Sequence, residues 1–93
     1  NPTRSKYFYA KLIEFANRKQ FSTVKILEVG CGNGMLSAQL LSLHLKSEQK
    51  DTLQFEIMGI DPSKESVLQA TENAKQLSLE ETKHSLQYAE GSI

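Results

Sequence analysis

Apolar positions recur along the chain with two different periods, and these periods predict helices and strands in alternation. Apolar side chains three and four residues apart predict helices over residues 3–19, 35–45 and 62–76. Short apolar runs, each followed by glycine or by Asp-Pro, predict strands over residues 25–29, 55–60 and 86–90. Between them, the polar and charged residues 46–54 predict an exposed loop.

The helical period also predicts which side chains face the core. In the order of the predicted helices these are Phe8, Tyr9, Leu12, Ile13, Phe15 and Ala16; Met35, Leu36, Leu40, Leu41 and Leu43; and Val67, Leu68, Ala70, Ala74 and Leu77. Pro62 is expected in the first turn of the third helix, where its missing N–H would be unpaired anyway.

The alternating order predicts an α/β fold. Parallel strands would be joined by right-handed crossovers, with helices on both faces of the sheet, in a Rossmann-like doubly wound arrangement. Ligands of such sheets bind beyond the carboxyl ends of the strands, beside the first strand. The segments that follow Val29 and Ile60 are therefore the predicted location of a binding site.

Residues 28–34, with the sequence Glu-Val-Gly-Cys-Gly-Asn-Gly, connect the first strand directly to a helix. Gly30, Gly32 and Gly34 can adopt backbone conformations closed to other residues, and they leave no Cβ to hold a ligand away from the main chain. The free N–H groups at the start of the helix would point at such a ligand. The alternative is a tight turn without a ligand.

The residues after this loop argue against two phosphate-binding motifs. A P-loop needs Lys and then Ser or Thr after its last glycine, but Met35 and Leu36 follow Gly34. The dinucleotide fingerprint needs a glycine at position 35. Met35 therefore disfavours a nicotinamide-dependent dehydrogenase, although it leaves that alternative open.

Asp61 ends the second strand, where a carboxylate can accept hydrogen bonds from two ribose hydroxyls or cap the following helix. Asp61 follows Gly34 by 27 residues, whereas in a compact βαβ unit the acidic residue follows the glycine motif by roughly 20. The exposed loop accounts for the difference as an insertion on the side away from the ligand. Glycine loop and acid together predict an adenosine-type ligand with no phosphate requirement.

Composition narrows the function further. With 93 residues, 39% hydrophobic and 24% charged, the chain supports one modest core and is neither a disordered tail nor a coiled-coil rod. One cysteine excludes an internal disulfide, and no apolar run reaches the roughly 18–20 residues of a membrane helix. The start without Met and the end after a strand suggest a piece of a longer protein.

The formal net charge is zero, which gives no reason to expect nucleic acid as a partner. The total conceals a gradient, because residues 1–25 carry six Lys and Arg against one acid and residues 26–93 carry five Lys against ten acids. The basic segment predicts either a contact with an anionic surface or simply a solvated helix face. His44 and His84 lack metal-ligand spacing, so no metal site is expected.

Glu28 and the three loop glycines, followed by Gly59-Ile60-Asp61, resemble the first two motifs of class I S-adenosylmethionine-dependent methyltransferases. The resemblance implies S-adenosyl-L-methionine as the cofactor. It also implies that the chain is the N-terminal, cofactor-binding half of one such domain. That half would consist of a leading helix (1–20) and a βαβαβ unit (25–93), with three strands of a seven-stranded methyltransferase fold.

The same resemblance assigns residues to the cofactor. Those implied are Glu28 near the ammonium group, Gly30, Cys31, Gly32 and Gly34 against the methionine part, Asp61 at the ribose, and Ser92 beside adenine. Cys31 is expected to be a loop residue and not a nucleophile, because no histidine lies nearby in the sequence.

A narrower resemblance covers nearly the whole chain. Asn1-Pro2-Thr3-Arg4 and the sequence from Val29 to Ser37 are similar to the ubiquinone-biosynthesis O-methyltransferases. That family implies a cofactor contact for Arg4, methyl transfer to a polyprenyl phenol or catechol, and a multi-enzyme complex. It also implies peripheral membrane contact through the basic N-terminal segment. The implied location is intracellular: the matrix side of the mitochondrial inner membrane in a eukaryote, and the cytoplasm otherwise.

No catalytic base is visible in the chain, and in the resembling family the groups that act on the acceptor lie beyond the third strand. We therefore expect these 93 residues alone to bind the cofactor weakly and to catalyse nothing. The alternatives are a methyltransferase for another small molecule and a non-catalytic module that binds a nucleoside.

Overall fold

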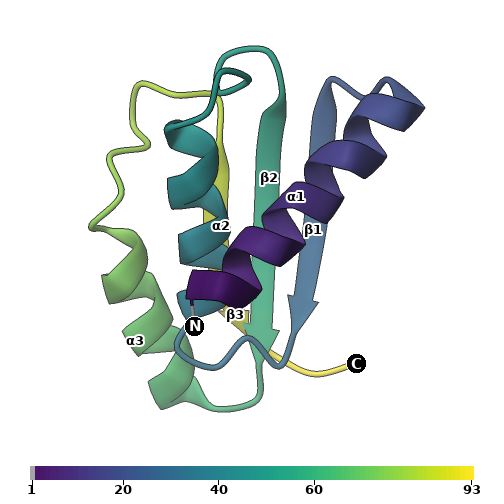
Figure 1. The fold of residues 1–93 in the computed structure, drawn as a ribbon. Helices are drawn as coiled ribbons and strands as arrows, with labels where there is room; N and C mark the ends of the chain where they lie inside the picture. Colours follow the sequence, from purple (N-terminus) through teal and green to yellow (C-terminus); the bar gives the residue numbers. More distant parts are fainter. Residues whose placement is uncertain (1) are drawn as a thin grey trace.

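The computed structural model describes residues 2–93, and its elements alternate as the sequence predicts (Figure 1). In chain order they are α1 (Pro2–Lys19), β1 (Thr23–Val29), α2 (Met35–Leu45), β2 (Gln54–Asp61), α3 (Lys64–Ala74) and β3 (Ser85–Glu90). Each strand begins one or two residues earlier than predicted, and α3 ends at Ala74 instead of residue 76.

The strands form one parallel sheet in the order β1-β2-β3. Val29 pairs with Ile60, and Asp61 pairs with Glu90, so the carboxyl ends of all three strands meet at one edge. This arrangement confirms the predicted Rossmann-like α/β class. The loop of residues 46–53 lies at the opposite edge, as predicted, because it precedes β2.

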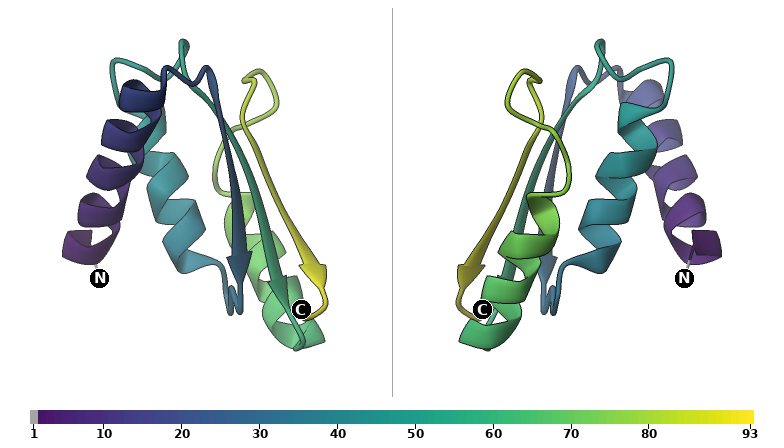
Figure 2. Two further views of the ribbon diagram at one scale, coloured as in Figure 1. Left: turned by 90° about the vertical axis from the view of Figure 1, so that its right-hand side faces the viewer. Right: turned by 90° about the vertical axis from the view of Figure 1, so that its left-hand side faces the viewer.

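All three helices of the described residues lie on one face of the sheet (Figures 1 and 2), so the prediction of helices on both faces is wrong for this part of the chain. The reason is the strand order: both crossovers step in the same direction, and right-handed crossovers then place α2 and α3 on the same side. The other face stays open, with Leu27, Val29 and Met58 exposed by 57, 54 and 36%.

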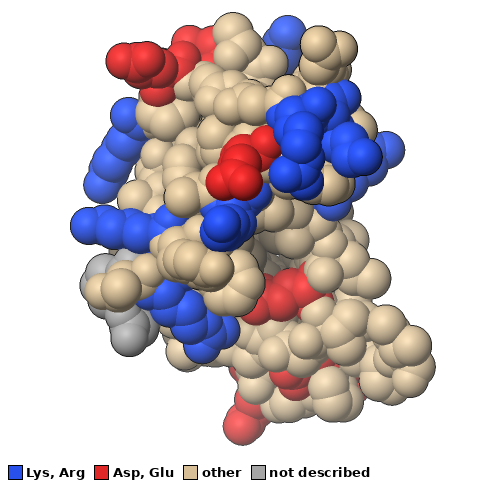
Figure 3. Space-filling model, turned by 45° about the vertical axis from the view of Figure 1, so that its right-hand side comes forward, with Lys and Arg blue, Asp and Glu red and all other residues tan. Residues whose placement is uncertain are grey.

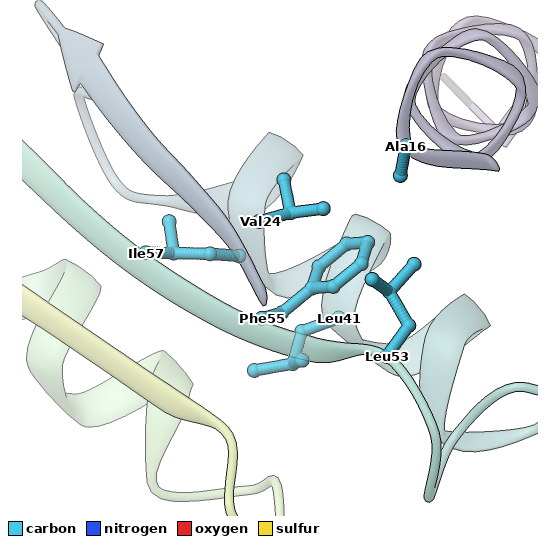
Figure 4. Packing of buried hydrophobic residues seen from close by; sticks show 6 residues of the cluster. All are labelled: Ala16, Val24, Leu41, Leu53, Phe55 and Ile57. Carbon is cyan, nitrogen blue, oxygen red and sulfur yellow. The ribbon is translucent and has the colours of Figure 1, made fainter. Parts of the chain in front are cut away.

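Phe55 of β2 lies at the centre of the core (Figure 4). The buried residues around it are Ala16, Val24, Leu41, Leu53 and Ile57. Burying a side chain such as Phe55 or Leu41 is worth about 1.5–3 kcal/mol. This cluster joins all the elements except α3 and β3. Leu77 and Leu79, from the segment that follows α3, and Leu86 of β3 are partly buried against it.

Several predicted core positions are exposed instead. Phe8 and Phe15 of α1 are 44 and 42% exposed, because the buried side of the helix is centred on Ser5, Leu12 and Ala16 and those aromatic rings lie on its flank. On α2, Met35 is exposed while Leu40 and Leu41 are buried. On α3, small Ala70 makes the close contact with the rest of the fold, and Leu68 faces away, 58% exposed.

The predicted place of Pro62 inside the third helix is also wrong. The N-cap of α3 is Ser63, whose hydroxyl accepts a hydrogen bond from the backbone N–H of Ser66 at 3.2 Å. Ser is a preferred N-cap because its side-chain oxygen satisfies one of the unpaired N–H groups at the helix start. Pro62 therefore precedes the cap.

Basic side chains gather over the face that α1 forms (Figure 3). Tyr7, Phe8, Phe15 and Phe21 are exposed among them. The Arg4 guanidinium lies 6.0 Å from the Phe8 ring and the Arg18 guanidinium 5.7 Å from the Phe15 ring. Within residues 2–93, no helix is long and apolar enough to cross a bilayer.

Two buried histidines, which sequence spacing did not connect, join the loops at the amino ends of the strands. His44 is fully buried and stacks on the Phe55 ring. Its Nε2 donates a hydrogen bond to the Leu53 carbonyl at 2.6 Å. The other ring nitrogen, Nδ1, is then the acceptor, and it accepts from the Tyr9 hydroxyl at 2.7 Å. His84 accepts from the Phe55 N–H through Nδ1 at 3.1 Å and donates through Nε2 to a carbonyl of the 46–53 loop at 2.8 Å. Both rings therefore use all their nitrogens in the neutral form.

We expect the protein to lose stability as the pH falls from about 7 to 5. Burial lowers the pKa of His44 below its ordinary value, so the unfolded chain binds a proton there that the native state does not. One such group removes up to about 1.4 kcal/mol of stability per pH unit. Urea unfolding at pH 7.5 and 5.5 measures this loss. The His44→Gln variant should be less stable than the wild type at pH 7.5, but its stability should fall less between pH 7.5 and 5.5. If its stability fell as much as that of the wild type, groups other than His44 would cause the acid loss.

Candidate functional site

The loop after β1 is tied to the end of β2 by backbone hydrogen bonds. The N–H groups of Gly30 and Cys31 both donate to the Ile60 carbonyl, at 2.8 and 3.0 Å. The loop then turns back on itself, with the Gly34 N–H donating to the Cys31 carbonyl at 3.0 Å. Parallel pairing of β1 and β2 thus places the predicted glycine loop directly against the segment that contains Asp61.

The Asp61 carboxylate connects this loop to the start of α3. Its Oδ2 accepts from the Gly32 N–H at 2.9 Å and its Oδ1 accepts from the Ser63 N–H at 2.9 Å. Each carboxylate oxygen has a further lone pair, so both can accept another hydrogen bond from a ligand. The helix-cap alternative for Asp61 is wrong, because Ser63 caps α3.

The three loop glycines all have positive φ, at 72, 57 and 76°, but they face different surroundings. A Cβ at Gly30 or Gly32 would meet no atom within 4 Å, so their side of the loop is open. A Cβ at Gly34 would lie 2.6 Å from the Tyr88 hydroxyl oxygen and 2.9 Å from the Ala70 Cβ. Gly30 and Gly32 therefore leave space where a ligand could lie, whereas Gly34 makes room for Tyr88.

A cavity of about 240 Å³ opens beside the loop. Its lining residues are Arg4, Glu28, Gly30, Cys31, Asn33, Met35, Leu36 and Gln39. Four of the predicted site residues, from α1, β1 and the loop, thus share one cavity although Arg4 and Glu28 are far apart in sequence. Pockets for drug-sized ligands are about 300–1,000 Å³, so this cavity fits part of a nucleoside-sized ligand.

The Glu28 carboxylate is the acidic group in the lining of this cavity. Burial raises the pKa of Glu28 above its ordinary value, and the nearby Ser37 side chain and the positive charge of Arg4 offset only part of that rise. Within the described residues its Oε1 is buried and has no hydrogen-bond partner. A buried acceptor without a partner is unfavourable by about 1–3 kcal/mol, so a ligand group that carries N–H donors and a positive charge would be stabilised there.

Cys31 lies in the loop as a buried thiol. Burial raises its pKa, and the nearby charges of Glu28 and Asp61 raise it further, so it stays protonated at neutral pH. A protonated thiol is a poor nucleophile, which agrees with the loop role that the sequence predicts.

Ser92 is not among the residues that line the cavity. The Gly91 N–H donates to the Asp61 carbonyl at 2.9 Å, which brings the end of β3 beside the ribose-binding candidate, but the Ser92 side chain is exposed. Asn1, the first residue of the Asn-Pro-x-Arg motif, lies outside the described residues. In the part of the chain that is described, no three His, Cys, Asp or Glu residues come together as a metal site.

Tyr88 and Ser37 contact the glycine loop at Gly34, and neither was predicted as a site residue. The Tyr88 ring fills the space at two glycines, because a Cβ at Gly59 would also lie 2.6 Å from its Cδ1 atom. Its hydroxyl is 2.8 Å from the Ser37 Oγ and 3.2 Å from the Gly34 carbonyl oxygen. The available sequence signal was Gly59 in the middle of a buried strand, which indicates a close neighbour.

Asn33 and Asn73 fix the outer side of the same loop. The Asn33 side-chain Oδ1 accepts from the Met35 N–H at 3.2 Å. The backbone carbonyl of Asn33 accepts from the side-chain amide of Asn73 at 3.0 Å. The second bond connects the loop to α3, the helix that follows Asp61.

Comparisons with known proteins agree with this geometry. Residues 20–91 match a family described as a methyltransferase domain. No curated protein matches the chain. Among solved structures, the fold resembles a SAM-dependent methyltransferase from Methanosarcina mazei, with a TM-score of 0.56 and 24% sequence identity over 76% of this chain. The matched part is 29% of that protein, so the chain spans under a third of its length.

Proposed function

The chain belongs to the methyltransferase domain family, and from that premise we propose that it forms the cofactor-binding part of an S-adenosylmethionine-dependent methyltransferase acting on a small molecule. The observation that carries the proposal is the buried, unpartnered Oε1 of Glu28 at the cavity beside the glycine loop. The ammonium group of the cofactor's methionine part would supply the missing donor and balance the carboxylate's charge.

The other residues of the site support the same ligand. Arg4 lines the cavity and carries the charge opposite to that of the cofactor's carboxylate. Gly30 and Gly32 leave the main chain open to contact, and Asp61 keeps lone pairs for two ribose hydroxyls while holding the loop in place. When bound, the cofactor supplies an electrophilic methyl group on its sulfonium; the residues described here bind and orient it.

We further propose that residues 1–93 are the N-terminal half of one methyltransferase domain. The open sheet face at Leu27, Val29 and Met58 supports this, because a parallel sheet is normally covered on both faces. So does the match to under a third of the Methanosarcina protein. On this proposal the acceptor site and the catalytic base lie in the rest of the protein, and the 93 residues alone catalyse nothing.

The narrower proposal is methyl transfer to the phenolic oxygen of a polyprenyl phenol or catechol in ubiquinone biosynthesis. Arg4 in the cavity supports it in part, because the Asn-Pro-x-Arg resemblance implies that contact. Transfer of a labelled methyl group by the full-length protein to a short-chain polyprenyl catechol tests it. If the protein transferred the methyl group only to unrelated acceptors, the polyprenyl catechol would be excluded as its substrate, whereas the methyltransferase proposal itself would be supported.

Location and partners follow from the same narrower proposal: the matrix side of the mitochondrial inner membrane in a eukaryote, otherwise the cytoplasm, within a multi-enzyme complex. The cations and exposed aromatic rings of α1 support peripheral contact with anionic lipid. Salt-sensitive sedimentation of the full-length protein with anionic vesicles tests that contact.

We expect the full-length protein to bind S-adenosylhomocysteine with a dissociation constant of order micromolar, and NAD far more weakly. The physical reason is that the loop and Asp61 suit a nucleoside, whereas Met35 stands where the pyrophosphate motif needs glycine. Isothermal titration with both ligands is the measurement. Tight NAD binding without a response to S-adenosylhomocysteine would overturn the proposed function.

A further inference from the structure

Phe8 of α1 keeps an aromatic ring at the surface, although an apolar side chain is more stable when buried. Its side chain is 44% exposed. The Arg4 guanidinium lies over this ring, 6.0 Å from the ring centroid. Residues four apart lie on the same side of a helix, so Phe8 stands one turn beyond Arg4 along α1. The exposed ring is therefore a surface against which the Arg4 side chain lies.

The same Arg4 side chain lines the cavity beside the glycine loop, together with Glu28. A guanidinium and a carboxylate in one cavity suit a ligand group that carries both a carboxylate and an ammonium. The methionine part of the cofactor is such a group, and a guanidinium is well shaped to bind its carboxylate. Among the described residues, Phe8 is not part of the cavity lining, so it can act on the ligand only through Arg4.

An exposed arginine binds a ligand better when its side chain is already held in place. Arg4 is exposed in the first turn of α1, and an arginine side chain has several rotatable bonds. Ordering those bonds at the moment of binding lowers the affinity. A neighbouring ring that holds the guanidinium beforehand reduces this loss. The adjacent Ser5 is 3% exposed, so the turn that carries Arg4 is itself anchored in the fold.

Building on the function proposed above, we propose that Phe8 is a positioning residue for the cofactor: its ring holds the Arg4 guanidinium at the cavity, where that guanidinium binds the carboxylate of the cofactor's methionine part. The ring attracts the guanidinium because the face of an aromatic ring carries negative charge. The site thus extends from the cavity lining to an exposed residue of α1. This role gives a reason for the exposure of Phe8, which the helical period predicts to face the core.

A second pair of arginine and phenylalanine on α1 provides a matched control. The Arg18 guanidinium lies 5.7 Å from the centroid of the Phe15 ring, and Phe15 is 42% exposed. Each of the two phenylalanine rings also meets one aromatic neighbour edge-on, Tyr7 for Phe8 and Phe21 for Phe15. The two pairs differ in their place. Arg18 is in the last turn of α1, near the edge of the sheet where the strands begin (Figure 1), and it is not among the residues that line the cavity.

The test is Phe8→Leu in the full-length protein, with the affinities of two ligands measured by isothermal titration. One ligand is S-adenosylhomocysteine. The other is its decarboxylated analogue, which keeps the nucleoside and the ammonium group and lacks only the carboxylate. Leucine keeps an apolar side chain on the helix but has no ring to hold Arg4. We expect S-adenosylhomocysteine to bind about 2- to 5-fold more weakly, which is the effect of one cation–π contact at an exposed site. The analogue should bind Phe8→Leu as tightly as it binds the wild type.

Phe15→Leu and Phe8→Tyr are the two control variants. Phe15→Leu removes a ring of matching exposure with its own arginine, so it should leave both affinities unchanged. Phe8→Tyr keeps a ring at the same place and should bind S-adenosylhomocysteine as tightly as the wild type does. If Phe8→Leu weakened both ligands equally, or if Phe15→Leu caused the same loss, the effect would be a general one on α1 and the proposal would be wrong.

Arg4→Ala separates the action through the guanidinium from other effects of the ring. In the Arg4→Ala background, Phe8→Leu should cause no further loss of S-adenosylhomocysteine affinity, since the ring acts through Arg4. Wild-type affinity in Phe8→Leu, or a full additional loss in the double variant, would overturn this inference and leave the proposed function intact. Absence of S-adenosylhomocysteine binding by the wild type would instead overturn the proposed function, and this inference with it.

Discussion

Asp61→Ala is expected to weaken S-adenosylhomocysteine binding by about 100-fold or more and to lower the stability of the protein. The carboxylate accepts hydrogen bonds from the Gly32 and Ser63 N–H groups, so its removal releases the glycine loop and leaves two donors unpaired. It would also remove the acceptors of two ribose hydroxyls. Each hydrogen bond to a charged group is worth about 1.5–3 kcal/mol, and about 2.7 kcal/mol corresponds to 100-fold in affinity.

Two further variants sharpen this prediction. Asp61→Asn keeps one oxygen acceptor but points an amide NH₂ at the other N–H group, so we expect it to bind nearly as weakly as Asp61→Ala. Asp51→Ala removes an exposed acid from the loop before β2 and should leave affinity unchanged. Isothermal titration measures all three, and wild-type affinity in Asp61→Ala would exclude a role for this carboxylate in the site.

Gly34→Ala is expected to destabilise the protein by about 3 kcal/mol or more. The added Cβ would lie 2.6 Å from the Tyr88 hydroxyl oxygen and 2.9 Å from the Ala70 Cβ, at a residue with φ of 76°. A left-handed conformation alone is unfavourable for alanine by about 1–2 kcal/mol, and the overlap adds to that because Tyr88 and Ala70 are both held by packing.

Gly30→Ala is the matched control for this substitution. Gly30 has nearly the same φ, 72°, but no atom lies within 4 Å of its Cβ position. Its loss of stability should therefore be limited to the backbone strain of about 1–2 kcal/mol. Urea unfolding of both variants gives the difference, and equal losses would show that Tyr88 and Ala70 yield to the added carbon.

The order of elements, and the meeting of the glycine loop with Asp61 at the candidate site, could be predicted from the sequence because both depend on local patterns. Alternating apolar periods define the strands and helices, and the glycine loop and Asp61 stand at strand ends that any parallel sheet brings together. The meeting of Arg4 with Glu28 was available only through a family resemblance, since nothing in the spacing of α1 and β1 requires it.

Other features depend on tertiary geometry and escaped sequence reasoning. Phe8 lies on the flank of α1 and is exposed. The apolar face of α1 is wider than the area that packs against the rest of the fold, so the sequence pattern does not show which part of that face is buried. His44 and His84 are 40 residues apart in sequence, yet their rings lie 5.1 Å from each other at the entrance to β2. Only the folded structure shows that the Tyr88 ring fills the space beside both Gly34 and Gly59.

The hydrogen bond between Gly32 and Asp61 spans only 29 residues of the chain. The loop and its carboxylate partner can therefore meet once β1, α2 and β2 have been synthesised, before β3 has left the ribosome. Contacts that close short chain segments form faster than distant ones, because less chain entropy is lost. The Gly32–Asp61 side of the candidate site can in this sense form early in folding, whereas Tyr88 can reach the loop only after β3 has paired.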